Sequence, residues 1–368
     1  MINPSFFFVQ KQPLINRYHK NNMIMKRGIE TQTETSLGRL KTEKAVELIK
    51  TTFLEALSER LTLTKVSAPA VVLTGTGIND DLNGVERAVR FPIKDWAERK
   101  AEVVHSLAKW KRVRLKEYDI PEGKGIITDM RALRPDEELS PLHSIYVDQF
   151  DWEKHISKTD RTIDVLKETV QNIYQALKLT EGKVYETYPD LLPFLPEQIT
   201  FIHSEDLLAE YPELSPKERE NAAAKKYGAF FLIGIGGALA DGKKHDGRAP
   251  DYDDWSTPTK KGQKGLNGDI VVWNPILECS FELSSMGIRV DEVALLRQLD
   301  LEDSLERTTL YYHRLLLEGK LPQSIGGGIG QSRLAMLLLR KQHIGEVQVS
   351  IWTDEIRQEA KKEGIHLL

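Results

Sequence analysis

The chain has 368 residues, of which 40% are hydrophobic and 29% are charged, as is usual for a soluble globular protein with room for one or two domains. A formal net charge of −4 argues against a protein built mainly to hold nucleic acid. The single cysteine excludes an internal disulfide and a cysteine-based zinc site, so a reducing, cytoplasmic location is expected. The longest strongly apolar run, residues 229–240, is too short to span a bilayer.

The N-terminal segment differs in charge from the rest of the chain. Residues 1–27 carry five Lys or Arg side chains and no Asp or Glu, a pattern loosely typical of a transit peptide. A disordered tail, or a translation start at Met23 or Met25, explains the same pattern, and we favour these explanations. We therefore set residues 1–30 aside as an extension and expect residues 31–368 to form a single domain.

Helical and alternating hydrophobic patterns succeed each other through the first half of the chain. Apolar residues at helical spacing predict amphipathic helices over residues 42–61 and 163–179. Residues 102–112 pass from a strand into a basic helix. Alternating or short apolar runs predict the strands 65–73, 88–93, 126–133, 142–152 and 199–203.

The second half begins with a marked helix start and ends with a strand. Ser215-Pro-Lys-Glu218 is a capping box with proline at the first helical position. We predict, in chain order, a helix over 216–227, strands over 229–235, 270–274 and 279–289, helices over 291–299 and 305–318, and a strand over 346–352. The strands 270–274 and 279–289 read as an antiparallel hairpin. This order indicates an α+β fold, a mainly antiparallel β-sheet flanked by helices, rather than a doubly wound sheet.

Two short stretches resemble nucleotide-binding loops. Residues 237–244 nearly match the phosphate-binding pattern GxxxxGK[ST], but Lys244 stands where a hydroxyl would hold Mg²⁺, and the following residues predict no helix. We reject that match. Gly326-Gly-Gly-Ile-Gly-Gln-Ser-Arg333 instead permits a close backbone approach to a ligand, with Ser332 capping a helix that begins at Arg333. A tight strand-to-helix turn with a surface arginine is the alternative.

Charged side chains beside the expected strands suggest a phosphate site. Lys111, Arg134 and Arg333 are cations next to polar strands, and the hairpin would bring Asp269 and Glu282 together. Two carboxylates suit Mg²⁺ bound to a polyphosphate, and fixed cations stabilise charge that develops on phosphate. The residues thus predict a nucleoside triphosphate site on an antiparallel sheet, with ordinary surface ion pairs as the alternative.

Several long segments resemble the ammonia-dependent asparagine synthetases, or aspartate–ammonia ligases. The resemblance runs from about Thr42 to the C-terminus and rests on residues 75–84, 104–112, 132–137, 140–152, 249–258, 265–275, 281–290 and 322–339. It implies a single catalytic domain with a class II aminoacyl-tRNA synthetase-like fold. It also implies ATP-dependent ligation of ammonia to the side chain of L-aspartate through β-aspartyl-AMP, which yields L-asparagine, AMP and pyrophosphate.

The resemblance implies roles for individual residues. Arg134 would contact the α-phosphate and the activated carboxylate, Arg333 would contact the adenine, and Asp80 would bind ammonium and take its proton, with Asp81 as a less favoured choice. Mg²⁺ would lie at Asp269 and Glu282. The expected aspartate-binding residues are Ser106, Lys111, Gln149 and Ser285. The expected ATP-binding residues are Arg134, Ser144, Val147, Asp253, Leu283, Gly328, Gly330 and Arg333.

Two other functions compete with this prediction. A tRNA-charging enzyme would share the fold, but the chain is not basic and has no room for a separate anticodon-binding domain. A nucleotide-sensing regulator would have no reason to keep Arg134, Asp269, Glu282 and Arg333 together. Free ammonia is favoured over glutamine because the chain starts Met-Ile and Cys279 lies inside the predicted hairpin. The resemblance further implies a homodimer, and we expect no membrane or nucleic-acid partner.

Overall fold

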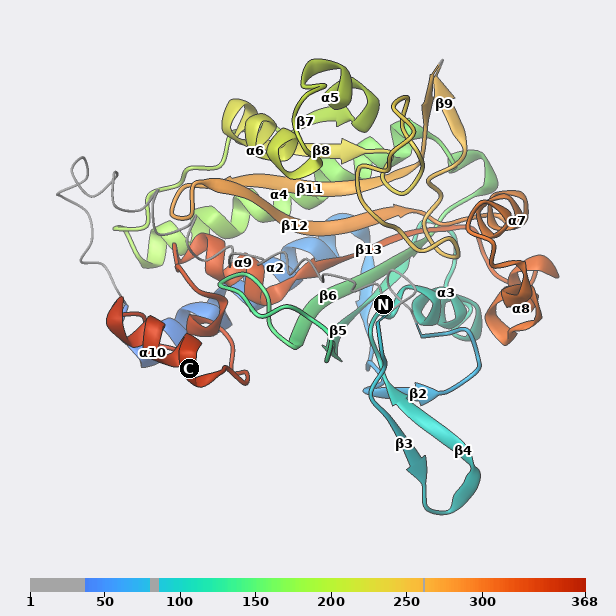
Figure 1. The fold of residues 1–368 in the computed structure, drawn as a ribbon, viewed down its shortest axis with the longest axis horizontal. Helices are drawn as coiled ribbons and strands as arrows, with labels where there is room; N and C mark the ends of the chain where they lie inside the picture. Colours follow the sequence, from blue (N-terminus) through green and yellow to red (C-terminus); the bar gives the residue numbers. More distant parts are fainter. Residues whose placement is uncertain (1–36, 80–85, 261) are drawn as a thin grey trace, which may run out of the picture. The chain divides into compact units, whose positions relative to one another are not determined.

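An eight-stranded sheet is the centre of this computed structural model, which describes residues 37–79, 86–260 and 262–368 (Figure 1). Its strands are β1 (Leu63–Lys65), β5 (Gly125–Leu133), β6 (Tyr146–His155), β7 (Thr200–His203), β8 (Ala229–Ile233), β11 (Asn267–Asn274), β12 (Cys279–Ile288) and β13 (Ser324–Gly330). Their order across the sheet is β1-β5-β6-β13-β12-β11-β8-β7. All neighbours are antiparallel except the edge pairs β1 with β5 and β7 with β8. The predicted α+β fold with a mainly antiparallel sheet is confirmed.

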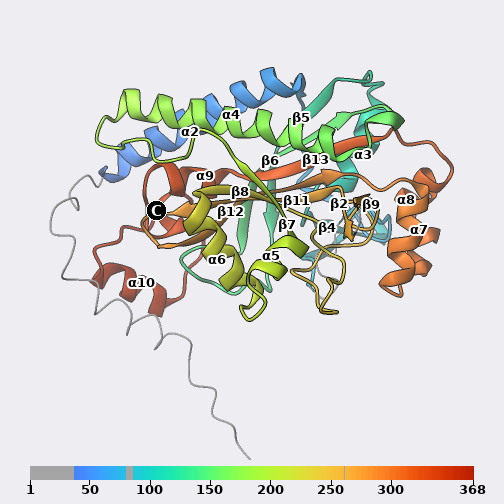
Figure 2. The same ribbon diagram turned by 90° about the horizontal axis from the view of Figure 1, so that it is seen from above.

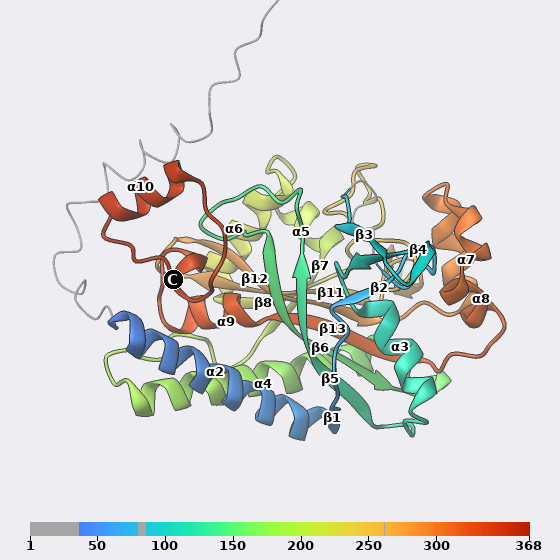
Figure 3. The ribbon, with the colours of Figure 1, turned by 90° about the horizontal axis from the view of Figure 1, so that it is seen from below.

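Two long helices, α2 (Arg39–Leu61) and α4 (Ile163–Thr187), lie side by side on one face of the sheet (Figures 2 and 3). Buried residues recur along α2 at helical spacing, as the sequence predicted. Phe53 of α2 packs on Phe150 of β6, with ring centroids 5.3 Å apart. Helix α9 (Gln331–Leu338) contacts α2 on the same side. The three helices therefore cover this face of the sheet.

The opposite face carries shorter helices. Helix α6 (Pro216–Tyr227) packs on β11 and β12, and Ser215 and Glu218 form the predicted capping box at its start. Helix α3 (Ala108–Glu117) contacts β6 and β13 further along the same sheet. The remaining helical elements are η1 (Lys158–Asp160), α5 (Ser204–Glu210), α7 (Glu292–Leu301), η2 (Leu305–Thr309), α8 (Tyr311–Leu317), η3 (Ile344–Glu346) and α10 (Asp354–Lys362).

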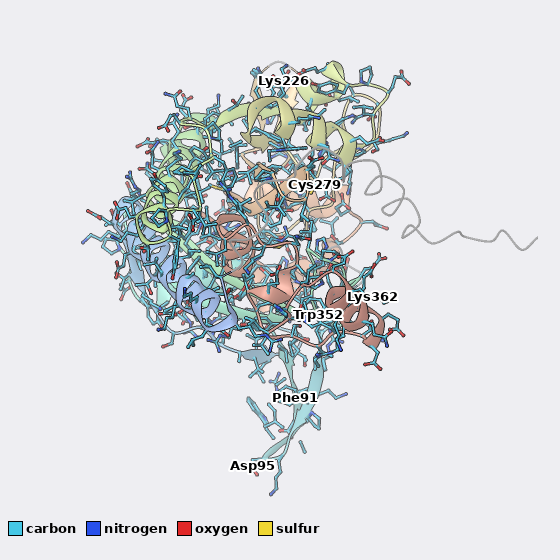
Figure 4. All side chains as sticks on the ribbon, turned by 90° about the vertical axis from the view of Figure 1, so that its left-hand side faces the viewer. Phe91, Asp95, Lys226, Cys279, Trp352 and Lys362 are labelled. Carbon is cyan, nitrogen blue, oxygen red and sulfur yellow. The ribbon has the colours of Figure 1, made fainter. Side chains whose placement is uncertain are left out.

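Two smaller sheets complete the described elements. Strands β2 (Val71–Leu73), β4 (Trp96–Val103) and β3 (Arg90–Ile93) form one, and β9 (Pro258–Lys260) pairs with β10 (Gln263–Lys264) in the other. The β3–β4 hairpin projects away from the main sheet, with Phe91 and Asp95 on it (Figure 4).

The glycine-rich stretch is a central strand rather than a turn. Residues 324–330 form β13 between β6 and β12. A Cβ on Gly326 would lie 2.0 Å from Glu153 Oε2, and one on Gly328 would lie 2.4 Å from Gln149 Oε1. The glycines are therefore required because side chains of β6 lie across this strand.

The structure differs from the sequence prediction at four places. The predicted strand 65–73 divides into β1 and β2, which belong to different sheets. The predicted helix 305–318 is interrupted at Leu310, whose ψ of 156° is extended. Residues 346–352 have no strand, and α10 after them was not predicted. Helix α9 starts at Gln331, and the Ser332 amide is bound by the Asp148 carboxylate at 2.9 Å, so Ser332 is not its N-cap.

Residues Arg39–Leu368 form one compact unit. The predicted domain boundary at residue 30 lies outside the described residues. Among the described helices, none combines the length and the apolar character that crossing a membrane requires.

Candidate active site

A bulge in the β11–β12 hairpin brings two carboxylates to one face of the sheet. Asp269 pairs with Ser285 and Val271 pairs with Glu282, so Leu283 is the extra residue on β12. In a regular strand without the bulge, Glu282 and Ser285 would point to opposite faces, because they are three residues apart and side chains alternate along a strand. Asp269 and Glu282 therefore lie on the same face of the hairpin. Burial raises the pKa of Asp269 to about 7, against the charge of Arg248 and with that of Glu282.

Strand β6 contributes polar groups to both faces. Gln149 and Asp151 line the cavities described below, on the side of Ser285 and Glu282. Asp148 points the other way, where it accepts from Lys50 Nζ of α2 and from the Ser332 amide, each at 2.9 Å. The polar pattern of residues 142–152 therefore has two causes. One set of side chains lines the cavities, and Asp148 on the other face anchors the start of α9.

Lys111 is a cation buried between α3 and the sheet. Its Nζ donates to Asp151 Oδ1 and to the Gly327 carbonyl, the latter at 2.9 Å. Burial lowers the pKa of Lys111, although Asp151 and Glu153 oppose that shift. A buried cation with a carboxylate beside it is suited to a zwitterionic substrate, because each group complements one end of an amino acid.

Two adjoining cavities open on this face. The Arg333 cavity, of about 250 Å³, is lined by Arg333, Arg134, His143, Ser144, Val147, Leu283 and Gly330 among others. The Lys111 cavity, of about 470 Å³, is lined by Lys111, Ser106, Arg248, Asp253, Tyr252 and Arg289 among others. Both share the residues Arg134, Glu137, Gln149, Glu282, Ser285 and Gly328.

Arg134 occupies the zone common to both cavities. Its Nε is buried with no hydrogen-bond partner among the described residues, and its Nη2 makes only a long contact of 3.4 Å to the His105 carbonyl. Burial raises the pKa of the nearby Glu137, although Arg134 and Arg333 oppose that shift. Arg134 is thus a cation whose donors remain available for an anion at the junction of the cavities.

Two hydrogen bonds hold Arg333 at the wall of the Arg333 cavity. Its Nη1 donates to the Glu282 carbonyl and its Nη2 donates to His143 Nε2, each at 2.9 Å. The Arg333 guanidinium also lies 5.9 Å from the ring centroid of Phe281. These contacts fix the plane of the guanidinium, which leaves a flat surface for an aromatic ring.

An ion-pair network behind the Lys111 cavity fixes its floor. Arg289 donates to Glu153 at 3.0, 3.2 and 2.7 Å and also binds Asp253, and Ser324 Oγ donates to Glu153 at 2.7 Å. Although burial opposes the charged form, Arg289 holds the pKa of Glu153 below its ordinary value. The network is fully buried and fully paired, so it is rigid.

Arg248 reaches the carboxylates from the loop after β8. Its Nη2 donates to Asp269 Oδ1 at 2.6 Å, its Nη1 donates to Ser285 Oγ, and its Nε lies 3.8 Å from Asp253 Oδ2. The side chain is 10% exposed and lines the Lys111 cavity.

The structure brings together nearly all of the predicted residues that it describes. Ser106, Lys111, Gln149, Ser285 and Asp253 line the Lys111 cavity, whereas Ser144, Val147, Leu283, Gly328 and Gly330 line the Arg333 cavity. Asp269 lines neither cavity, but it accepts a hydrogen bond from Arg248, which lines the Lys111 cavity. The Ser144 hydroxyl already binds Ser350 Oγ and the Tyr146 amide, so its side chain is engaged within the fold. Asp80 and Asp81 lie outside the described residues.

The sequence did not identify five residues as parts of the site. Asp151 and Arg289 share strand faces with Gln149 and Ser285, so strict two-residue alternation was the signal that pointed to them. Glu137 follows Arg134 by three residues. His143 and Arg248 come from loops, where no periodicity predicts the direction of a side chain.

Solved structures place this fold in a known class. The asparaginyl-tRNA synthetase of Pyrococcus horikoshii complexed with asparaginyl-adenylate has a TM-score of 0.63 and 14% identity, over 84% of this chain and 70% of that chain. The asparaginyl-tRNA synthetase of Entamoeba histolytica has a TM-score of 0.60 and 14% identity, over 92% and 72%. The chain therefore has the catalytic fold of class II aminoacyl-tRNA synthetases.

Sequence relatives define the family within that class. Residues 40–364 match the family described as aspartate-ammonia ligase. Aspartate–ammonia ligases from Parabacteroides distasonis, Bacteroides fragilis and Clostridium perfringens are 61%, 58% and 52% identical over 327 residues, which cover 89% of this chain and 95% of each relative. The chain belongs to the aspartate–ammonia ligase family, whose reaction joins ammonia to aspartate to give asparagine.

Proposed function

We propose that the ligation proceeds through β-aspartyl-AMP, with pyrophosphate and then AMP as leaving groups. The observation that carries this proposal is the place of Arg134, whose available donors lie where the Arg333 and Lys111 cavities join. A nucleotide in the first cavity and aspartate in the second would meet at this arginine. A phosphoryl group between two substrates needs such a fixed cation, because negative charge increases there during the reaction. The Pyrococcus horikoshii neighbour, of the same fold, is bound to an aminoacyl-adenylate.

The residues on either side of Arg134 have complementary tasks. Arg333 would lie against the adenine, in the cavity that Val147, Leu283, Gly328 and Gly330 also line. In the other cavity, Lys111 would bind the α-carboxylate of aspartate and Asp151 would bind its ammonium group. Gln149, Ser285 and Ser106 would fix the side chain of aspartate. One oxygen of its β-carboxylate would then attack the α-phosphorus, with pyrophosphate as leaving group.

Magnesium is the metal that the donor set fits. Asp269 and Glu282 share one sheet face, Glu282 is 43% exposed, and no cluster of three metal-binding side chains exists among the described residues. Two carboxylates alone hold Mg²⁺ weakly, but together with phosphate oxygens they complete the coordination that it prefers. When bound, Mg²⁺ would neutralise charge on the β- and γ-phosphates.

The second half of the reaction needs uncharged ammonia. Asp80 would bind ammonium and accept its proton, since only the neutral amine attacks the acyl carbon. Attack breaks the bond from the acyl carbon to the phosphate oxygen, and AMP leaves with that oxygen. We further propose that the enzyme acts in the cytoplasm and forms a homodimer. Light scattering of the purified protein would test the homodimer.

An isotope experiment tests the adenylate directly. With ¹⁸O in both β-carboxylate oxygens of aspartate, one labelled oxygen is expected in AMP after turnover. Label in inorganic phosphate, together with ADP, would contradict the adenylate and would require an acyl phosphate. Aspartate labelled only in its α-carboxylate is the matched control and should leave AMP unlabelled.

A further inference from the structure

Arg248 stands where the proposed function requires a metal. Its guanidinium binds Asp269 Oδ1 at 2.6 Å, and Asp269 has no other cation within 4 Å among the salt bridges of residues 37–79, 86–260 and 262–368. The opposing carboxylate of the hairpin, Glu282, has only a loose contact of 3.8 Å with Arg333. Arg248 therefore supplies the positive charge that lies closest to the Asp269 carboxylate among the described residues.

This ion pair differs from the structural pairs nearby. Arg289 is completely surrounded by Glu153, Asp253 and the glycine strand, and a Cβ on Gly326 would already contact its Nη2 at 2.6 Å. Both arginines line the cavity of about 470 Å³, but the Arg248 side chain is 10% exposed whereas that of Arg289 is only 2% exposed. A long side chain at a cavity wall can turn toward a ligand, whereas Arg289 cannot.

The backbone that carries Arg248 is anchored, so only the side chain is free to turn. The Ala249 carbonyl accepts from Trp255 Nε1 at 3.3 Å, and the buried His245 side chain binds Glu220 of α6 at 3.2 Å. Arg248 Cβ packs closely against Gly236, since a Cβ on that glycine would lie only 2.8 Å from it. These contacts hold the backbone near Arg248 and its Cβ in place.

We propose that Arg248 is the resident counter-cation of the Asp269 carboxylate, and that it yields this carboxylate to a divalent metal only when the metal arrives with a nucleoside triphosphate. The freed guanidinium then binds the polyphosphate, whose oxygens match its planar donors. The inference rests on the proposed function, because it takes Asp269 and Glu282 as the metal-binding pair. It assigns Arg248 a part in substrate binding and makes the metal and the nucleotide enter together.

The consequence is a protein that binds free divalent metal poorly before ATP is present. Replacing Arg248 with a neutral side chain should remove the competing charge. Arg248→Gln should therefore bind Mn²⁺ without nucleotide about tenfold more tightly than the wild type, because a unit charge at contact distance is lost from the site. The same variant should bind ATP more weakly, since the polyphosphate loses a cation.

The test is a Mn²⁺ titration of the full chain without nucleotide, with free Mn²⁺ measured by electron paramagnetic resonance. Arg297→Gln is the matched control, because Arg297 binds Ser256 Oγ and Thr257 Oγ1 and its loss changes the net charge equally. Arg248→Lys keeps a cation and should resemble the wild type. The double variant Arg248→Gln with Asp269→Asn should lose the gain, which assigns the bound Mn²⁺ to this carboxylate.

Two results would overturn the inference. One is an Arg248→Gln variant whose Mn²⁺ affinity equals that of Arg297→Gln while its melting curve remains cooperative. The other is a wild type that binds Mn²⁺ equally well with and without a non-hydrolysable ATP analogue. Either result leaves the adenylate reaction standing if the ¹⁸O experiment labels AMP. Label in phosphate would instead overturn the proposed function, whatever the Mn²⁺ titration shows.

Discussion

His143 Nε2 accepts a hydrogen bond from Arg333 Nη2 at 2.9 Å, and His143 Nδ1 lies 2.9 Å from Ser140 Oγ. A guanidinium only donates, so Nε2 carries the lone pair and Nδ1 carries the proton. Burial, followed by the charge of Arg333, lowers the pKa of His143 to about 4. The imidazole is therefore a neutral acceptor that orients Arg333 across the physiological pH range.

Loss of this acceptor should weaken ATP binding and spare aspartate binding. In His143→Leu the charged guanidinium of Arg333 loses a hydrogen-bond acceptor. The KM for ATP should therefore rise about tenfold. The KM for aspartate should stay the same because Lys111 and Asp151 are untouched. His143→Gln, whose side-chain carbonyl can accept the same bond, should recover part of the loss. An equal rise in both KM values would show a general structural defect instead.

The same side chain makes a predictable contribution to acid sensitivity. Its pKa is 6.5 in the unfolded chain and about 4 in the folded chain, so between these values only the unfolded state binds the proton. The stabilisation is complete above the unfolded value and is lost as the pH falls through the folded value. The melting temperature of the wild type should therefore fall more steeply than that of His143→Gln between about pH 7 and about pH 5. Parallel curves for the two proteins would contradict the lowered pKa.

The strand glycines should be intolerant of a methyl group. In Gly326→Ala the new Cβ would meet Glu153 Oε2 at 2.0 Å and Arg289 Nη2 at 2.6 Å, and Ser324 prevents that carboxylate from retreating. Strain in a buried ion pair should cost about 3 kcal/mol in the free energy of unfolding. Gly182→Ala in α4 is the control, because nothing lies within 4 Å of its Cβ position and the change should stabilise the helix by about 0.5–1 kcal/mol. Urea unfolding measures both, and equal effects would refute the crowding argument.

Cys279 should be dispensable for catalysis. It begins β12 beside the hairpin turn, opposite Asn274, and burial raises the pKa of its thiol (Figure 4). A thiol with a raised pKa is a poor nucleophile, and its place is that of a packing residue. Cys279→Ala should keep kcat with ammonium within about twofold and cost at most about 1 kcal/mol of stability. Loss of turnover in a variant with an intact circular dichroism spectrum would sink this view.

Local signals in the sequence were enough for most elements. The β11–β12 hairpin follows from the two apolar runs on either side of Pro275, which lies in the connection between the strands. The start of α6 follows from Ser215 and Glu218, which make both reciprocal capping bonds. These features depend on neighbours within a few residues, so the chain alone determines them.

Features that depend on distant neighbours were not predictable. Residues 346–352 alternate like a strand, but Gln348 and Ser350 bind Tyr146 and Ser144 through side chains, and no backbone ladder forms. The bulge at Leu283 follows from pairing with β11, and it decides the direction of Glu282. Arg248 reaches Asp269 from a separate loop, and no pattern around residue 248 shows that contact.

The roles of the predicted residues remain uneven in their support. Arg134, Arg333, Lys111 and Gln149 converge on two joined cavities, which the sequence interpretation required. The ammonia site at Asp80 stays a prediction because that residue lies outside the described part of the chain.

The most direct test of the account is a product analysis with ATP, Mg²⁺, L-aspartate and ¹⁵N-ammonium, without tRNA. Labelled asparagine together with equal amounts of AMP and pyrophosphate is the expected result. Asparagine with ADP and phosphate would contradict the roles given to Arg134 and Arg333, because the α-phosphorus would then never be attacked. ATP–pyrophosphate exchange without any asparagine would show an activating enzyme that lacks the ammonia step.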